Sequence, residues 1–153
     1  MINLIDVDIE ALNYVNDELK KTIQENDLSK KLKRHVNYFP ADLIKYLKSE
    51  SLPVTEQDLI YAIGIADYLD DNVLIALMNL IYKSLSPGGT AIIGNFCDNS
   101  CDAMMRYVVD WKLNLRTEDD LLRLASKSLL SSSDLSIFYE SEKINVFLKV
   151  KVQ

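Results

Sequence analysis

An acidic residue closes the first apolar segment of the chain. Residues 2–5 are apolar apart from one asparagine, which is typical of a short buried strand, and Asp6 ends it. A carboxylate in this position only accepts hydrogen bonds, which suits the two hydroxyls of a ribose. Asp6 is therefore a candidate ligand of a nucleotide-type cofactor, and capping the next helix is its alternative role. Metal binding by Asp6 and Asp8 is disfavoured, because two carboxylates make a poor cage for a cation.

Glycine is missing where such a site usually has it. In dinucleotide-binding folds the ribose acid ends the second strand, after a first strand and a glycine-rich turn. In this chain the first glycine is Gly64. The sequence thus predicts one half of a nucleotide-type site without the other half.

The elements that must position these residues alternate between strand and helix. Apolar residues at three- and four-residue spacing predict helices, and short apolar runs predict strands. The predicted strands are 2–6, 35–39, 58–63, 90–96, 135–139 and 144–152, and the predicted helices are 9–25, 42–48, 70–85, 101–115 and 117–126. Strands that alternate with helices indicate a parallel sheet, whereas the last two strands follow one another and predict an antiparallel hairpin.

Several motifs along this pattern resemble class I S-adenosylmethionine-dependent methyltransferases. Asp6 matches the acid at the end of that family's second strand, and Asp58–Tyr61 matches the start of the fourth. Leu85–Gly89 is similar to the Leu-x-Pro-Gly-Gly turn that precedes the fifth strand. The resemblance covers nearly the whole chain. It implies a single α/β domain over residues 1–153, with a Rossmann-like, mostly parallel sheet, a C-terminal antiparallel β-hairpin and no first strand.

Three further patterns resemble a bacterial branch, the extracellular-factor (3-hydroxypalmitic acid methyl ester) biosynthesis proteins. They are Gly64–Leu69 after a tyrosine-bearing strand, Gly94–Phe96 at the end of the fifth strand, and Asp110–Leu113 followed by Arg116. This resemblance implies methyl transfer to a small or fatty carboxylic acid.

The resemblance also assigns candidate residues to the cofactor S-adenosylmethionine. Asp6 would hold the ribose, Asp42 would lie near the adenine, and Ile63 and Gly64 would line the site at the end of the fourth strand. The alternative role of Asp42 is a helix N-terminus, and that of Gly64 is a tight turn.

A second group of residues would contact the methyl acceptor. Arg106 and Arg116 can pair with a carboxylate, although surface or structural salt bridges are their alternative role. Tyr68, Asn95 and Trp111 would line the pocket, with burial in the core as the alternative for Trp111. A carboxylate is already anionic near pH 7, so methyl transfer to it needs positioning and desolvation but no general base.

The missing first strand would lie in the middle of the family's sheet. Without it, the fold should show a gap or two unpaired strand edges, which favour association. We expect that this chain is part of a longer protein, that another polypeptide or a second copy completes the sheet, or that the sheet closes without the strand. A non-catalytic remnant or interaction module of the same fold is the alternative function. A nicotinamide-dependent dehydrogenase is disfavoured by the terminal hairpin and the Pro-Gly-Gly turn.

Composition and charge argue against several classes of function. The chain has 153 residues, a net charge of −6, 48% hydrophobic residues and 26% charged residues. An acidic chain is a poor partner for nucleic acid, and the basic cluster in residues 30–34 is interpreted as a solvated helix end.

No apolar run reaches the ~20 residues of a membrane span. Two cysteines, Cys97 and Cys101, are too few for zinc and fit a cytoplasmic location, and the lone His35 argues against a catalytic triad.

Overall fold

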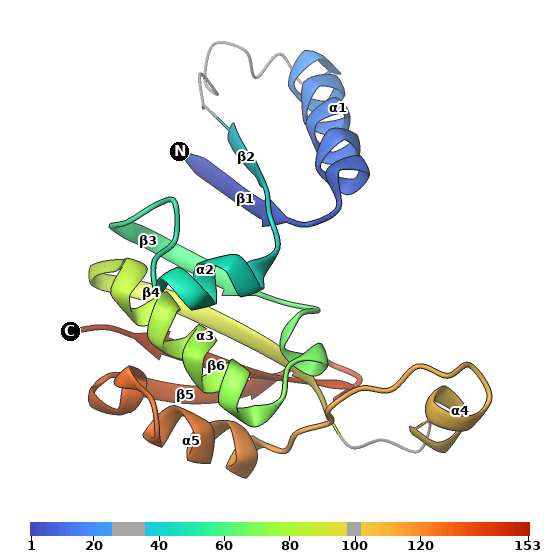
Figure 1. Cartoon of the computed structure of the whole chain (residues 1–153), viewed down its shortest axis with the longest axis vertical. Helices are drawn as coiled ribbons and strands as arrows, with labels where there is room; N and C mark the ends of the chain where they lie inside the picture. The colour runs from blue at the N-terminus through green and yellow to red at the C-terminus, as the bar shows by residue number, and fades with distance from the viewer. Residues whose placement is uncertain (26–35, 98–101) are drawn as a thin grey trace. The chain divides into compact units, whose positions relative to one another are not determined.

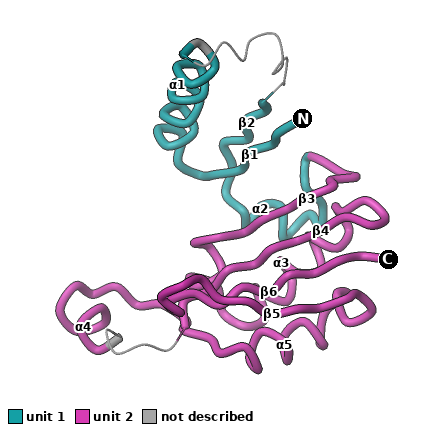
Figure 2. Tube along the Cα trace, turned by 180° about the vertical axis from the view of Figure 1, so that it is seen from behind, with its two compact units in different colours: residues 1–53 teal, residues 54–153 magenta. Residues whose placement is uncertain are grey.

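The structure is a computed structural model that describes residues 1–25, 36–97 and 102–153 (Figure 1). His35, the basic cluster at 30–34 and Cys101 lie outside the described residues. The chain divides into two compact units, residues 1–53 and residues 54–153 (Figure 2). A single domain spanning residues 1–153 stays a prediction.

Unit 1 is built on a parallel pair of short strands. Strand β1 (Ile2–Asp6) pairs with β2 (Val36–Pro40). Between them lies helix α1 (Ile9–Glu25), which begins where Asp8 Oδ1 accepts hydrogen bonds from the backbone N–H groups of residues 10 and 11, at 2.8 and 3.2 Å. Asp8 is therefore the cap of this helix. Helix α2 (Leu43–Ser49) completes the unit.

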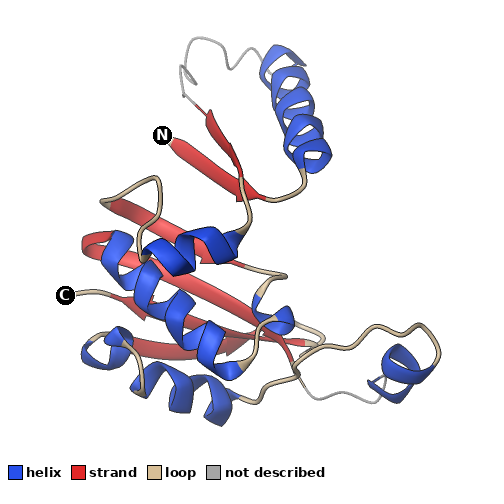
Figure 3. Ribbon diagram, in the orientation of Figure 1, coloured by secondary structure: helices blue, strands red, loops and turns tan. Residues whose placement is uncertain are grey.

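Unit 2 contains a four-stranded sheet with the order β3-β4-β6-β5. Its strands are β3 (Gln57–Ala62), β4 (Leu85–Phe96), β5 (Asp134–Tyr139) and β6 (Asn145–Lys151). β3 and β4 run parallel, whereas β6 is antiparallel to both β4 and β5. The C-terminal hairpin is thus confirmed, with its second strand inserted in the interior of the sheet (Figure 3).

Two helices cover the same face of this sheet, as Figures 1 and 2 show from opposite sides. They are α3 (Asp71–Ser84) and α5 (Glu118–Ser126). Each starts at a capping side chain: Asp70 accepts from the Val73 N–H at 2.9 Å, and Thr117 and Asp120 form a capping box. Side chains on the covered face are fully buried, among them Leu74, Met78, Ile81, Ile93, Leu121, Val146, Leu148 and Val150.

One face of β3 is exposed, although its residues form an apolar run in the sequence. Leu59 and Tyr61 are 55% and 62% exposed, whereas Ile60 and Ala62 alternate with them and are half-buried. An apolar run cannot distinguish a strand covered on both faces from one covered on a single face. Among the described residues of unit 2, helices cover one face only.

The Pro-Gly-Gly turn forms a bulge at the start of β4. The β3–β4 register shifts there, from Gln57 opposite Leu85 to Leu59 opposite Thr90. A Cβ on Gly89 would come within 2.8 Å of the Ser86 carbonyl oxygen and 2.9 Å of the Gln57 carbonyl oxygen. Glycine is required at this position because the two strands' backbones approach too closely for any side chain.

The predicted helix over residues 101–115 is wrong in its length. Helix α4 covers only Asp102–Tyr107, and irregular chain follows it. The left-handed φ of +50° at Asp110 is incompatible with a continuing helix, and the two valines that precede it are poor helix formers. Helix α4 and the chain after it project from the sheet of unit 2 (Figure 1), and residues 102–111 are called the arm.

Two adjacent leucines in α5 test the packing of unit 2. Leu121 is fully buried and Leu122 is 36% exposed. We expect Leu121→Ala to lower the free energy of unfolding by about 2–5 kcal/mol, because it leaves a cavity. Leu122→Ala, which makes the same change in the same helix, should cost less than about 1 kcal/mol. Urea unfolding followed by circular dichroism compares them, and equal losses would contradict the packing.

Candidate cofactor and acceptor site

The two candidate cofactor acids lie at the carboxyl end of the strand pair in unit 1. Asp6 is the last residue of β1, and its Oδ1 accepts a hydrogen bond from the Asp8 N–H at 2.9 Å. Asp42 follows β2 and caps α2, with Oδ1 2.9 Å from the N–H of Ile44. The Ala41 N–H donates to the Asp6 carbonyl oxygen at 2.9 Å, which keeps the two strand ends together. Both carboxylates sit at one edge, where open α/β sheets bind ligands.

The other two cofactor candidates follow β3 in unit 2. Gly64 has a φ of +78°, and a Cβ built on it would meet nothing within 4 Å. The positive φ therefore favours glycine at this turn. The backbone of Gly64 also faces open space. Ile63 is 56% exposed at the same strand end. The structure thus pairs Asp6 with Asp42 in one unit, and Ile63 with Gly64 in the other.

An aromatic cluster forms at the carboxyl ends of β3 and β4. The Trp111 indole Nε1–H donates to the Tyr68 hydroxyl at 3.0 Å. The ring of Phe96 meets Trp111 edge to face, with centroids 5.9 Å apart and an interplanar angle of 74°. Tyr68 and Trp111 are 55% and 41% exposed, so the cluster presents an aromatic surface to solvent. The sequence predicted Tyr68 and Trp111 at this site but not Phe96. The one signal for Phe96 was its position at the end of a predicted strand.

Asn95 and Arg116 lie beneath this cluster. Asn95 is fully buried, and its amide donates to the carbonyl oxygens of Phe96 and Asn114, both at 2.9 Å. Its Oδ1 accepts from Arg116, which is itself only 4% exposed. The predicted role of both residues in contacting an acceptor directly stays a prediction. Their hydrogen bonds are made to backbone groups near Tyr68 and Trp111 and to Phe96 itself.

The residues that precede Trp111 in the sequence add exposed apolar surface. Met104, Tyr107, Val108 and Val109 are 58–82% exposed. Arg106 is half-buried on the same short helix α4. Apolar side chains gathered on an exposed segment are typical of a surface that binds an apolar ligand or partner.

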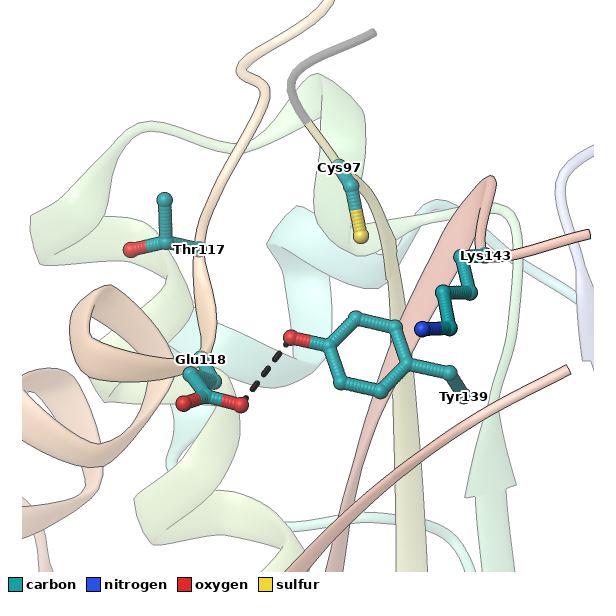
Figure 4. Close-up of a pocket in the computed structure, with 5 residues that line it drawn as sticks. All are labelled: Cys97, Thr117, Glu118, Tyr139 and Lys143. Carbon is teal, nitrogen blue, oxygen red and sulfur yellow. Dashed lines mark hydrogen bonds between the residues drawn. The ribbon is translucent and has the colours of Figure 1, made fainter.

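A hollow of about 410 Å³ lies beside the end of β4, lined by Cys97, Thr117, Glu118, Tyr139 and Lys143 (Figure 4). The Tyr139 hydroxyl donates to Glu118 Oε2 at 3.0 Å. Burial, and then the Glu118 hydrogen bond, raise the pKa of Tyr139. Burial and the charge of Glu140 raise the pKa of the Cys97 thiol, which disfavours the reactive thiolate.

Sequence reasoning missed this hollow, because its residues come from three separate segments. Tyr139 ends a predicted strand and Thr117 starts a predicted helix, so their positions were the only signal. Within the described part of the chain, no group of three or more histidine, cysteine or acidic side chains is arranged to hold a metal. In those same residues, no helix has the length and apolar character needed to cross a membrane.

Comparison with solved structures gives the fold. The structure is similar to a possible exported protein from Bordetella parapertussis, with a TM-score of 0.71 and 16% identity over 98% of this chain and 52% of that one. It is similar to the S-adenosylmethionine-dependent methyltransferase SibL in its apo form, with a TM-score of 0.62 and 14% identity over 98% and 42% of the two chains. The fold is the Rossmann-like fold of methyltransferases.

A third similar structure is the N-methyltransferase NodS from Bradyrhizobium japonicum WM9, in complex with S-adenosyl-L-homocysteine. Its TM-score is 0.59, with 17% identity over 98% of this chain and 65% of NodS. This chain therefore spans 42–65% of the length of these three proteins. No family model matches the sequence, and no curated protein sequence matches it.

Asp71 allows a test of the charges around the buried arginine. Burial alone would raise the pKa of Asp71, but hydrogen bonds and positive charge from Arg116 and Arg123 outweigh it and hold the pKa below its usual range. A lowered pKa stabilises the fold above the unfolded-state value, and this stability is lost as the pH falls through the folded-state value.

We expect Asp71→Asn to destabilise the protein by about 1 kcal/mol at pH 7, a figure reduced for its half-exposed carboxylate. The difference from the original protein should shrink toward zero as the pH falls through the lowered pKa of Asp71. Urea unfolding at pH 7 and at acid pH measures both. Asp110→Asn, which removes an exposed ion pair with Lys112, is the control and should change little at either pH. A loss that does not depend on pH would contradict the assignment.

Proposed function

We propose that this chain belongs to an S-adenosylmethionine-dependent methyltransferase that methylates a small-molecule acceptor, a small or fatty carboxylic acid. The fold shared with SibL and NodS supports the reaction class. The single observation that carries the proposal is the pair of exposed carboxylates, Asp6 and Asp42, at one strand edge of that fold.

The residues present suit the cofactor's nucleoside portion. The exposed carboxylate of Asp6 would accept hydrogen bonds from the ribose hydroxyls, and Asp42 would lie beside the adenine. Gly64 lies in unit 2, and its predicted role at the cofactor stays a prediction. When bound, S-adenosylmethionine supplies a methyl group on a positively charged sulfur.

The acceptor side follows from the aromatic cluster and the arm. Tyr68, Phe96 and Trp111 would shield the acceptor from water, which favours transfer between two reactants held in line. The exposed apolar residues of the arm would contact an acyl chain. A carboxylate needs no base near pH 7, and Arg106 would orient it through its positive charge.

A non-catalytic interaction module is the second candidate. It is favoured by the two separate sheets of the described residues, in which β1 pairs only with β2 and β3 only with β4. It is also favoured by the glycines, which all lie between positions 64 and 94. Cofactor binding by the chain decides between the candidates.

Calorimetry with S-adenosylhomocysteine tests the cofactor site. We expect binding by this chain and at least tenfold weaker binding by Asp6→Asn, since charge-assisted hydrogen bonds to a ribose contribute about 1.5–3 kcal/mol. Asp17→Asn removes the same charge from an exposed position on α1 and should bind as the original does. Absence of binding by the original chain favours the interaction module. Equal binding by Asp6→Asn removes Asp6 from the site.

A series of straight-chain carboxylates tests the acceptor class. Each added CH₂ that becomes buried contributes about 0.8 kcal/mol, or roughly a fourfold gain in affinity. We expect affinity to rise from octanoate to dodecanoate, accompanied by a change in the fluorescence of Trp111, the chain's only tryptophan. Affinity that does not depend on chain length, or fluorescence that stays constant, would contradict an acyl acceptor at this surface.

A further inference from the structure

The guanidinium of Arg116 uses all of its hydrogen-bonding capacity inside the protein. Nη1 donates to the Ala66 carbonyl oxygen and to Asn95 Oδ1, both at 2.9 Å. Nη2 donates to the Leu69 carbonyl oxygen at 2.7 Å and to Asp71 Oδ1 at 3.0 Å, and Nε donates to the same Asp71 oxygen at 3.2 Å. These bonds account for the five N–H groups of an arginine. Direct binding of an external carboxylate would break at least one of them.

The acceptors of Arg116 surround the residue that carries the aromatic surface. Ala66 begins the short 3₁₀ helix Ala66–Tyr68, and Leu69 follows it. Arg116 therefore holds both ends of the turn that presents Tyr68. Its other two acceptors belong to the end of β4 and the start of α3, so one side chain joins three elements.

Asp67, which lies within the same turn, also bonds this turn to the end of β4. It is 2% exposed, and its Oδ1 accepts a hydrogen bond from the backbone N–H of Phe96. Its own carbonyl oxygen accepts from the Asn114 N–H at 2.7 Å, and the Asn114 side chain donates to the Leu69 carbonyl oxygen at 3.1 Å. Burial raises the pKa of Asp67, while the Phe96 hydrogen bond and the Arg116 charge lower it in part.

The chain that follows the arm returns to this network. The Arg116 N–H donates to the carbonyl oxygen of Phe96, the last residue of β4, at 3.0 Å. Trp111 lies on the returning part of the arm, bonded to Tyr68 and packed on Phe96. The positions of all three aromatic rings thus depend on residues held by Arg116 and Asp67.

We propose that Arg116 is a positioning residue, which fixes the Tyr68–Phe96–Trp111 surface by holding the Ala66–Leu69 turn against the end of β4. Only the ligand part of this inference rests on the proposed function. The positioning itself can be measured in the protein without ligand, because Trp111 is the only tryptophan.

The first experiment compares Arg116→Lys with Arg123→Lys. Lysine keeps the charge but has three donors on one nitrogen and cannot replace a planar five-donor group. Arg123 shares Asp71 with Arg116 but is 46% exposed, which makes it a matched control. We expect Arg116→Lys to shift Trp111 emission to longer wavelength and to raise its quenching by acrylamide about twofold. Arg123→Lys should leave both unchanged.

Stability separates positioning from a merely structural role. If Arg116→Lys folds with a lower free energy of unfolding but with the native emission and quenching of Trp111 unchanged, the proposal is overturned. Should Arg116→Lys fail to fold by circular dichroism, Asn114→Ala decides. It removes one exposed side chain that donates to Leu69, and it should move Trp111 in the same direction by a smaller amount. Unchanged Trp111 signals in Asn114→Ala would then overturn the proposal.

Binding of dodecanoate, measured by calorimetry, distinguishes positioning from direct contact. We expect Arg116→Lys to bind about tenfold more weakly, together with the altered Trp111 signal of the free protein. Weaker binding with an unaltered Trp111 signal would mean that Arg116 contacts the ligand itself and would overturn the positioning role. If no variant, nor the original chain, binds dodecanoate, the proposed acceptor class fails, while the Trp111 result still decides the positioning role.

Discussion

A buried guanidinium needs a partner for every N–H, since each one left without a partner costs about 1–3 kcal/mol. In this protein Arg116 meets that requirement with two loop carbonyls, one buried amide and one carboxylate. The loop after β3, the end of β4 and the start of α3 must therefore adopt one mutual arrangement. This arrangement in turn fixes the positions of Tyr68, Phe96 and Trp111.

Local signals in the sequence were sufficient for most elements. The apolar spacing in residues 70–85 and 117–126 and the apolar run in residues 144–152 depend on neighbours in the chain, and the structure has α3, α5 and β6 within these ranges. The burial of Asn95 and the partners of Arg116 could not be predicted, because they depend on groups 21–50 residues away. The length of α4 was overestimated because apolar spacing in residues 104–111 mimics a helix, whereas those side chains are largely exposed.

The described strands form two sheets that share no strand, and the gap expected between them stays a prediction. The predicted cofactor residues are divided in the same way, with Asp6 and Asp42 in unit 1 and Ile63 and Gly64 in unit 2. The residues that the sequence predicts at the acceptor, Tyr68, Asn95, Arg106, Trp111 and Arg116, all belong to unit 2. The predicted cofactor residues are thus divided between the two units, whereas the predicted acceptor residues lie in one.

The position of β6 has a consequence for how the protein is made. It follows the other three strands of this sheet in the sequence, yet it lies between β4 and β5 and is the one strand of the sheet that pairs with β5. During synthesis β3 and β4 can pair first, whereas β5 can join their sheet only after Asn145–Lys151 has left the ribosome. Val146, Leu148 and Val150 also fill the core under α5. The core of unit 2 is therefore complete only once β6 has paired, and contacts between segments so far apart in the chain slow folding.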